Sequence, residues 1–240
     1  MRTTVHLPYR SALIVGAGPG LGASLALAFM RDAGMRVVMA ARQLDKLQPA
    51  ADALGAVALR CDATDPANVQ ALFDQASDRL GSAPDVVVYN ASRRVRGPFV
   101  DVDATEVAQA VAVTAHGAFL VAQQAARRML AQGQGALLFT GASASIKGYP
   151  LSAAFAMGKF ALRGLAQSLA RELHPQGIHV GHVVVDGSIR PSPDATAVTP
   201  GTADSQLDPD AIAQTYLHLL AQPRNAWTWE IEVRPCGEKF

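Results

Sequence analysis

Short apolar segments alternate along the chain with longer segments in which apolar residues recur at helical spacing. The apolar segments predict seven strands, at residues 12–15, 36–40, 56–60, 85–89, 136–140, 179–185 and 228–233. The longer segments predict six helices, at residues 21–33, 44–54, 66–80, 104–132, 151–174 and 209–221. This alternation is typical of a parallel sheet with helices on both faces, whose strands are continuously apolar. The pattern therefore predicts one doubly wound, three-layer α/β domain over residues 1–240.

One segment interrupts this alternation. Residues 187–208 are rich in Pro, Ser, Thr, Asp and Gly and contain almost no large apolar side chain. The segment follows the end of a predicted strand, and open α/β sheets bind their ligands outside the carboxyl ends of the strands. We therefore expect a substrate loop or lid here, with a simple surface linker as the alternative.

Composition narrows the range of partners. The chain has 240 residues, 17% of them charged, and a net charge of +1, which provides no basic surface for nucleic acid. No apolar run approaches the ~20 residues of a membrane-spanning helix, and the N-terminal segment lacks the apolar core of a signal peptide. Cys61 and Cys236 are too few for a disulfide framework. We therefore expect a cytoplasmic protein with a small-molecule partner, bound to neither nucleic acid nor membrane.

A glycine-rich turn joins the first predicted strand to the first predicted helix. Gly16 permits a tight turn, Gly20 lets the backbone approach a ligand, and Gly22 allows close packing. The first N–H groups of a helix and its dipole favour negative charge, so a pyrophosphate would bind at this turn. The strand, turn and helix together favour dinucleotide binding over an ordinary strand-to-helix connection.

The spacing Gly16-x-x-x-Gly20-Leu21-Gly22 resembles the cofactor loop of the short-chain dehydrogenase/reductase family. Asp62-Ala63 after the third strand and Asn90-Ala91 after the fourth resemble further landmarks of that family. The resemblance implies a Rossmann-like sheet of seven parallel strands and a nicotinamide cofactor. It assigns cofactor binding to Gly16, Pro19, Gly20, Leu21, Gly22, Asp62, Ala63, Asn90, Ala91, Lys159, Gly187 and Ile189.

The end of the second strand bears on the choice of cofactor because it contacts the adenosine ribose. It offers Ala41 and Arg42, so no carboxylate is present to bind a 2′-hydroxyl and repel a 2′-phosphate. The guanidinium of Arg42 suits that phosphate. We therefore expect NADP(H) to be preferred over NAD(H); if Arg42 is only a solvated residue, NAD(H) remains acceptable.

The catalytic segment departs from the family. Family members carry a Tyr four residues before a Lys, so that the ammonium lowers the phenol pKa and the pair passes a proton to the substrate oxygen. Here Lys159 is present, but the position of the Tyr is Phe155. Ser143, twelve residues earlier, is the candidate for the substrate-orienting serine, with Ser145 as the spare and a strand-end cap as the alternative role. The helix Asn of the family falls on Thr114.

Several residues are candidates to replace the missing phenol. Tyr149, His116 and Asp186 carry titratable groups in the predicted site region. The stronger interpretations are a turn aromatic for Tyr149, a helix-surface residue for His116 and a turn residue for Asp186. Arg93, Arg94 and Arg96 form a basic cluster that either borders the site or lies in solvent. The histidines at positions 174, 179 and 182 lack metal-ligand spacing and are expected to be structural: His174, His179 and His182.

Two functions remain open. One is an NADP(H)-dependent oxidoreductase acting on a small carbonyl or alcohol, with reduction of a carbon–carbon double bond as a narrower variant. The other is a catalytically impaired NADP(H)-binding regulator or sensor on the same fold, suggested by Phe155 and Thr114. The family resemblance also implies a homodimer or homotetramer formed through the helices at 104–132 and 151–174.

Overall fold

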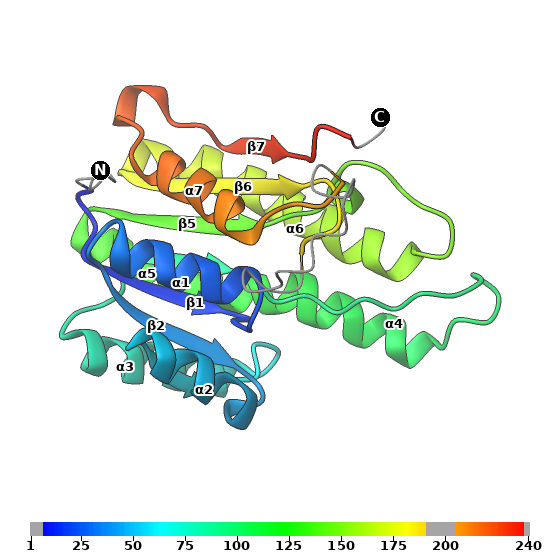
Figure 1. Cartoon of the computed structure of the whole chain (residues 1–240), viewed down its shortest axis with the longest axis horizontal. Coiled ribbons are helices and arrows are strands. Elements are labelled where there is room, and N and C mark those ends of the chain that lie inside the picture. The colour runs from blue at the N-terminus through cyan, green and yellow to red at the C-terminus, as the bar shows by residue number, and fades with distance from the viewer. Residues whose placement is uncertain (1–6, 191–204, 238–240) are drawn as a thin grey trace.

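The computed structural model describes residues 7–190 and 205–237 and places all of its strands in one parallel sheet (Figure 1). The strands are β1 (Ser11–Val15), β2 (Arg36–Ala41), β3 (Val57–Arg60), β4 (Val86–Tyr89), β5 (Gly135–Thr140), β6 (Ile178–Val185) and β7 (Glu230–Val233). Their order across the sheet is β3-β2-β1-β4-β5-β6-β7. The predicted Rossmann-like sheet of seven parallel strands is thus confirmed.

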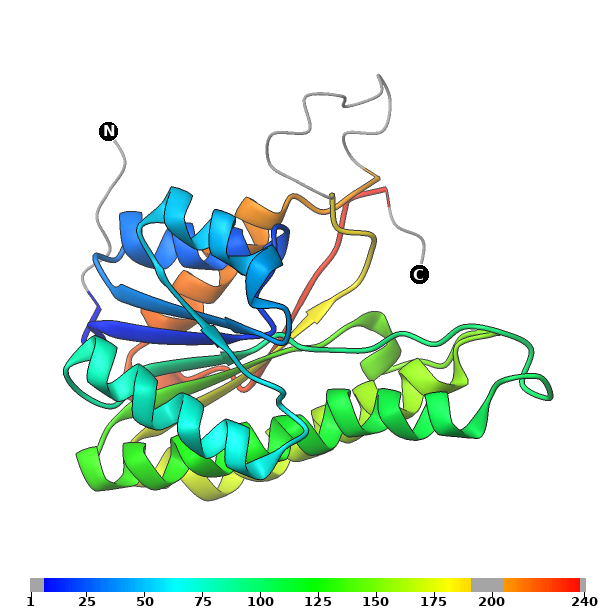
Figure 2. The same ribbon diagram turned by 90° about the horizontal axis from the view of Figure 1, so that it is seen from below.

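Helices cover both faces of the sheet (Figure 2). One layer contains α1 (Leu21–Arg31), α2 (Leu44–Leu54) and α7 (Pro209–Leu220), and the other contains α3 (Pro66–Leu80), α4 (Ala104–Val111), α5 (Gly117–Gln132) and α6 (Ala153–Leu173). Each layer encloses its own apolar core against the sheet. Every residue of β1, β4, β5 and β6 is buried, as expected for strands covered on both faces.

The strand order determines where a ligand binds. The sequence order runs outward in both directions from β1 and β4, which lie side by side in the middle of the sheet. The two connections that leave their carboxyl ends go to opposite faces, and this opens a crevice between them. The glycine turn after β1 and the segment after β4 therefore face each other.

The predicted helix at 104–132 is interrupted, which is a correction to the sequence analysis. A π-helical turn, η1 (Ala112–His116), separates α4 from α5. The Tyr89 hydroxyl donates a hydrogen bond to the Val113 carbonyl in this turn, and a Cβ on Gly117 would come within 2.6 Å of that hydroxyl. A buried tyrosine on β4 thus holds the wider turn, and π-turns of this kind are frequent at functional sites.

The helical segment at 104–132 is also long and apolar enough to cross a membrane by length and composition alone. In this fold, Val121, Ala125 and Met129 on one side of it are buried against the sheet and the neighbouring helices. One side of the segment therefore packs as in other helices of an α/β layer.

The helix predicted at 151–174 begins two residues later, at Ala153. Leu151 adopts a positive φ of 61°, and its carbonyl accepts a hydrogen bond from the Gly97 amide at 3.0 Å. The left-handed backbone at Leu151 stops the helix from extending backward. This turn brings the loop after β4 against the start of α6.

The segment predicted as a substrate loop lies partly outside the described residues, at 191–204. Its two ends are joined by a parallel bridge between Ile189 and Leu207. The Arg190 amide donates to the Leu207 carbonyl at 2.9 Å, and the Leu207 amide donates to the Ser188 carbonyl at 2.8 Å. The base of the loop is thus held beside the carboxyl end of β6, and its role as a lid stays a prediction.

Candidate active site

The glycine turn after β1 packs directly on the segment after β4. Gly16 has φ +84°, and a Cβ there would collide with the backbone of Ala91. The Gly16 carbonyl accepts a hydrogen bond from Asn90 Nδ2 at 2.9 Å. A Cβ on Gly22 would lie 2.8 Å from the Ala17 Cα, so the predicted close packing at this position is found. Gly20 precedes α1, whose N-terminus has no side-chain cap and keeps its N–H groups available for an anion.

We expect Gly16→Ala to lower the free energy of unfolding by about 2 kcal/mol or more, because it combines a positive φ with the collision at Ala91. The matched control is Gly18→Ala, where an added Cβ meets nothing within 4 Å. Urea unfolding of both variants measures the difference. Equal stability of the two variants would contradict the geometry.

A cavity of about 390 Å³ opens beside this turn. Residues of the glycine turn, the end of β2 and the end of β3 line it, among them Gly16, Pro19, Arg42, Asp62 and Ala63. Asp62 Oδ1 accepts hydrogen bonds from the Thr64 hydroxyl at 2.7 Å and the Thr64 amide at 2.9 Å. These hydrogen bonds hold the pKa of the Asp62 carboxyl below its ordinary value. Asp62 therefore presents a fixed carboxylate to the cavity.

The charges at the β2 end of this cavity are basic. Arg42 lines the cavity as predicted, and Lys46, from the first turn of α2, lines it too. Among the described residues, Asp62 is the only acidic side chain in the lining, and it belongs to the β3 end. Lys46 was not predicted from the sequence, because Arg42 precedes the helix and no local spacing places the two side chains together.

A second cavity, of about 690 Å³, continues from the first and shares Asn90 and Ser92 with it. We call this second cavity the chamber. It is lined by the loop after β4, the turn after β5, the start of α6 and the residues that follow β6, among them Gly187 and Ile189. Leu21, at the start of α1, also lines it. The two cavities form one crevice along the carboxyl edge of the sheet, as the strand order requires.

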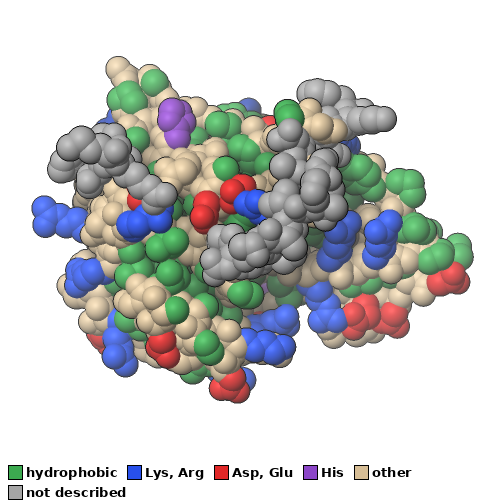
Figure 3. Space-filling view, in the orientation of Figure 1, with side chains coloured by type: hydrophobic (Ala, Val, Ile, Leu, Met, Phe, Trp, Pro, Cys, Tyr) green, Lys and Arg blue, Asp and Glu red, His purple; other side chains and the backbone are tan. Residues whose placement is uncertain are grey.

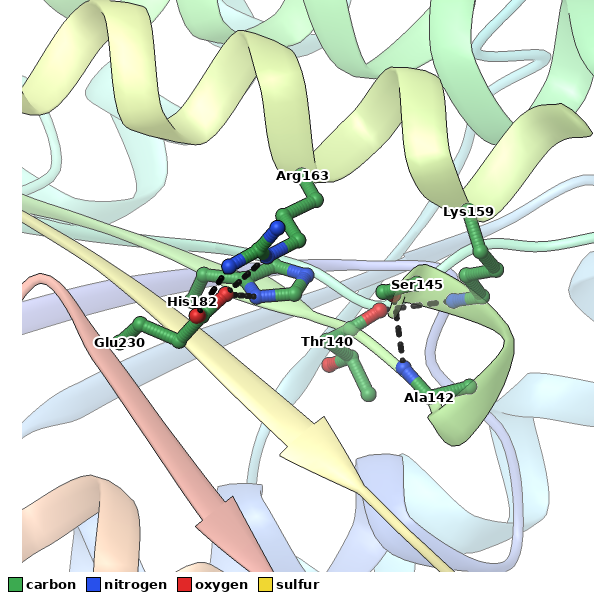
Figure 4. A network of polar contacts seen from close by, with 7 residues as sticks. All are labelled: Thr140, Ala142, Ser145, Lys159, Arg163, His182 and Glu230. Atoms are coloured by element: carbon green, nitrogen blue, oxygen red, sulfur yellow. Dashed lines mark hydrogen bonds and ion pairs between the residues drawn. The ribbon is translucent and has the colours of Figure 1, made fainter. Parts of the chain in front are cut away.

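Lys159 is the buried cation of the chamber. Its side chain comes from α6, and its Nζ donates to the Thr140 carbonyl at the end of β5 at 2.7 Å (Figure 4). Only 3% of the residue is exposed. Burial lowers the pKa of Lys159 to about 8, because the charged form loses hydration. Lys159 therefore holds its proton less tightly than an ordinary lysine.

Phe155 occupies the position one helical turn before Lys159, and its ring lines the chamber. Lys159 Nζ lies 5.8 Å from the ring centroid, and the Arg94 guanidinium carbon lies 5.3 Å from it. The ring thus has two cations close to it. It offers them a π face but no titratable proton.

The structure distinguishes between the two candidate serines. Ser143 lines the chamber, whereas Ser145 does not. Ser145 is fully buried, and its Oγ accepts a hydrogen bond from the Ala142 amide at 3.1 Å. Ser143 is therefore the serine that lies at the chamber, and Ser145 holds the turn that carries it.

The candidates for replacing the phenol have different environments. Tyr149 lines the chamber and is partly exposed. Asp186 also lines it, but its carboxylate is ion-paired with Lys147 at 3.4 Å and with Arg234 at 3.0 Å. His116 is exposed, stacks on Phe119 on the surface of η1 and α5, and lines neither cavity. The structure thus brings Tyr149 and Asp186 to the site and excludes His116 from it.

A polar network joins α6, β6 and β7 next to Lys159 and Thr140 (Figure 4). The Glu230 carboxylate accepts hydrogen bonds from the Arg163 guanidinium at 2.6 and 2.7 Å and pairs with His182 Nδ1 at 3.0 Å. Burial lowers the pKa of His182 to about 4, so the ring is neutral near pH 7 and donates from Nδ1. Its Nε2 lies directly under Gly141, where there is no room for a Cβ. The network thereby fixes the His182 ring against Gly141, in the turn that leads to Ser143.

Comparison with known proteins shows which family and which structures this chain resembles. Residues 10–193 match the family described as short chain dehydrogenase. An uncharacterized oxidoreductase of Staphylococcus aureus strain N315 is 32% identical over 233 residues, which cover 93% of this chain and 96% of the relative. A short-chain dehydrogenase structure from Rhodopseudomonas palustris is 32% identical with a TM-score of 0.79, over 94% of this chain and 98% of its own. A metagenomic short-chain oxidoreductase in complex with NADP has a TM-score of 0.80 at 24% identity, over 95% and 98% of the two chains, and shares the fold.

Proposed function

Because the chain belongs to the short-chain dehydrogenase/reductase family of oxidoreductases, we propose that it transfers a hydride between NADP(H) and a small carbonyl or alcohol compound. One observation carries the proposal. The first cavity has two cations, Arg42 and Lys46, at the end of β2, and it continues into a chamber that contains Lys159 and Ser143. That arrangement suits a 2′-phosphorylated dinucleotide at one end and a reacting carbonyl at the other.

The residues present fit such a cofactor. The Gly16 turn leaves no room for side chains next to Ala91, and the uncapped N-terminus of α1 is suited to a pyrophosphate. Asp62 and Ala63 would contact the adenine end, and Asn90, Ala91, Lys159, Gly187 and Ile189 would line the path to the nicotinamide end. The bound nicotinamide supplies the hydride. The metagenomic short-chain oxidoreductase in complex with NADP, which shares the fold, is consistent with the proposed preference for NADP(H).

The protein's own residues would handle the proton. The Ser143 hydroxyl donates a hydrogen bond to the carbonyl oxygen and orients it. Phe155 carries no titratable proton, so the oxygen would take its proton from another group of the chamber, such as the Lys159 ammonium or the Tyr149 hydroxyl, or from water. Because the pKa of Lys159 is lowered to about 8, its ammonium is a better acid than that of an exposed lysine.

A second function is favoured by one observation, the Phe155 ring in the position of the acid. A protein that binds NADP(H) without turnover would retain both cavities and report the bound cofactor to a partner. Measurable turnover by the natural chain separates the enzyme from this regulator or sensor.

The cofactor preference is tested by Arg42→Ala and Lys46→Ala. We expect each variant to bind NADPH about tenfold more weakly and NADH unchanged, because a charge-assisted hydrogen bond to phosphate is lost. Arg36→Ala, at the opposite end of β2, is the matched control and should retain NADPH affinity. Calorimetric titration gives both constants. NADH binding at least as tight as NADPH binding by the natural chain would refute the preference.

We also propose a homodimer or homotetramer in the cytoplasm. Phe119 on α5 and Met157 and Phe160 on α6 are exposed by 44%, 56% and 44%, and these apolar side chains lie on the two helices expected to form the interface. Burying them against a second copy removes apolar surface from water. The free thiols of Cys61 and Cys236 fit a reducing compartment.

A further inference from the structure

The segment that follows β4 directs alternate side chains to opposite sides. Ser92, Arg94 and Arg96 line the chamber. Arg93, between them, points away from it and forms an ion pair with Glu106 on α4. This two-residue alternation is that of an extended chain, so the segment places the exposed Arg94 and Arg96 at the chamber and the half-buried Arg93 against α4.

The chamber arginines have no acidic partner. Among residues 7–190 and 205–237, the ion pairs include neither Arg94 nor Arg96. Of the lining residues that the structure describes, Asp186 is the only acidic one, and Lys147 and Arg234 already pair with it. Lys159 adds a third cation to the lining. The chamber therefore holds uncompensated positive charge, which attracts an anionic ligand.

Phe155 gives one of these arginines a defined place. The Arg94 guanidinium lies 5.3 Å from the ring centroid, within the range of a cation–π interaction. Lys159 Nζ lies 5.8 Å from the same centroid. The guanidinium and the ammonium therefore both approach the same ring. A short molecule with a carboxylate near its carbonyl group would reach both.

We propose that Arg94 and Arg96 bind the carboxylate of the substrate, so that the chamber accepts short oxo acids and the corresponding hydroxy acids. A guanidinium binds a carboxylate through two parallel hydrogen bonds, which fixes the carbonyl group relative to Ser143 and Lys159. In this role Phe155 is the surface on which Arg94 rests. Figure 3 shows Lys and Arg side chains gathered on the right of this face of the molecule.

The chemistry deepens the proposed function and rests on it for turnover. Reduction adds the hydride of NADPH to the carbonyl carbon and a proton to the carbonyl oxygen, giving the hydroxy acid and NADP⁺. The carboxylate is unchanged on both sides of the reaction. It therefore serves for recognition in either direction.

The test compares acids with neutral amides of the same shape. The probes are 2-oxobutanoate with 2-oxobutanamide, and acetoacetate with acetoacetamide, titrated calorimetrically into the full chain with and without NADPH. We expect at least one acid to bind about tenfold or more tightly than its amide at low ionic strength, with the preference falling as salt is added. NADPH oxidation with each probe is followed in parallel.

The variants Arg94→Gln and Arg96→Gln should lose the preference for the acid while keeping NADPH affinity. Phe155→Leu, which removes the ring next to Arg94, should weaken the preference for the acid. Arg93→Gln removes the same charge from the same segment but outside the chamber, and it should behave as the natural chain.

The outcomes separate the two proposals. Acid preference without NADPH binding would support the carboxylate site and refute the proposed cofactor. NADPH binding with turnover of a neutral amide as efficient as that of its acid would support the oxidoreductase and overturn the carboxylate site. Acid preference that survives both arginine substitutions would also overturn the carboxylate site. Arginine variants that lose NADPH affinity and keep acid affinity would overturn it as well.

Discussion

Replacing Phe155 by Tyr is expected to raise the rate of carbonyl reduction by about 10²-fold or more, since a positioned general acid typically contributes that much. The new hydroxyl would extend the ring that already lines the chamber, one helical turn before Lys159. Lys159 and Arg94 both lie within 6 Å of the ring centroid, and these two cations would lower the pKa of the phenol. The variant would thereby regain the acid that the family uses.

The measurement is single-turnover and steady-state oxidation of NADPH by the natural chain and by Phe155→Tyr, with the same carbonyl panel. Turnover that appears only in the variant would indicate an intact hydride site without its acid and would favour the regulator. Comparable turnover by both chains would contradict the expected gain and direct the search for the proton donor to Lys159, Ser143 and Tyr149. Phe160→Tyr, on the exposed side of the same helix, is the control.

Replacing Lys159 by Met is expected to reduce turnover by about 10²-fold or more and at the same time to stabilise the fold. Lys159 is buried, with only the Thr140 carbonyl as its hydrogen-bond partner. Lowering its pKa from 10.5 to about 8 costs the folded protein about 3 kcal/mol at neutral pH. The lost hydrogen bond offsets about 1 kcal/mol of this, so the variant should gain about 2 kcal/mol.

The pH dependence of that gain follows from the direction of the pKa shift. Below pH 8, Lys159 is protonated in both the folded and the unfolded chain, and the full destabilisation is present. Between about pH 8 and 10.5 the folded chain binds fewer protons than the unfolded chain, so the stability of the natural protein rises with pH relative to the variant. The difference should therefore be largest near pH 7 and narrow toward pH 10.5.

Urea unfolding of the two proteins across this pH range measures the difference. Lys147→Met is the matched control, because Lys147 is not buried and its pKa is raised. A difference between the natural chain and Lys159→Met that does not change with pH would contradict the buried-charge argument. In the natural enzyme, the rate of reduction should also fall as pH rises through about 8, if Lys159 supplies the proton.

Much of the fold was predictable from local patterns. The apolar segments predicted all seven strands to within two residues, because strands buried on both faces must be apolar along their whole length. The Gly16 turn was recognisable because a tight turn before a helix requires glycine whatever surrounds it. The spacing of Phe155 and Lys159 was equally informative, since residues four apart on a helix share a face.

The directions of the site side chains were decided by contacts between distant segments. The choice of Ser143 over Ser145 depends on the turn after β5, and the exclusion of His116 depends on the π-turn that Tyr89 holds from another strand. Likewise, Arg94 at the chamber and Arg93 against α4 differ by one position in sequence.

The sequence by itself thus determined the order of the elements, the glycine turn after β1 and the helix that carries Lys159, because each depends on interactions within a few residues. Only the tertiary structure decided which polar side chains meet in the chamber, and that Lys46 joins Arg42 at the end of β2. The physical reason is that a side chain's direction and burial depend on packing between segments far apart in the chain, which no local pattern records.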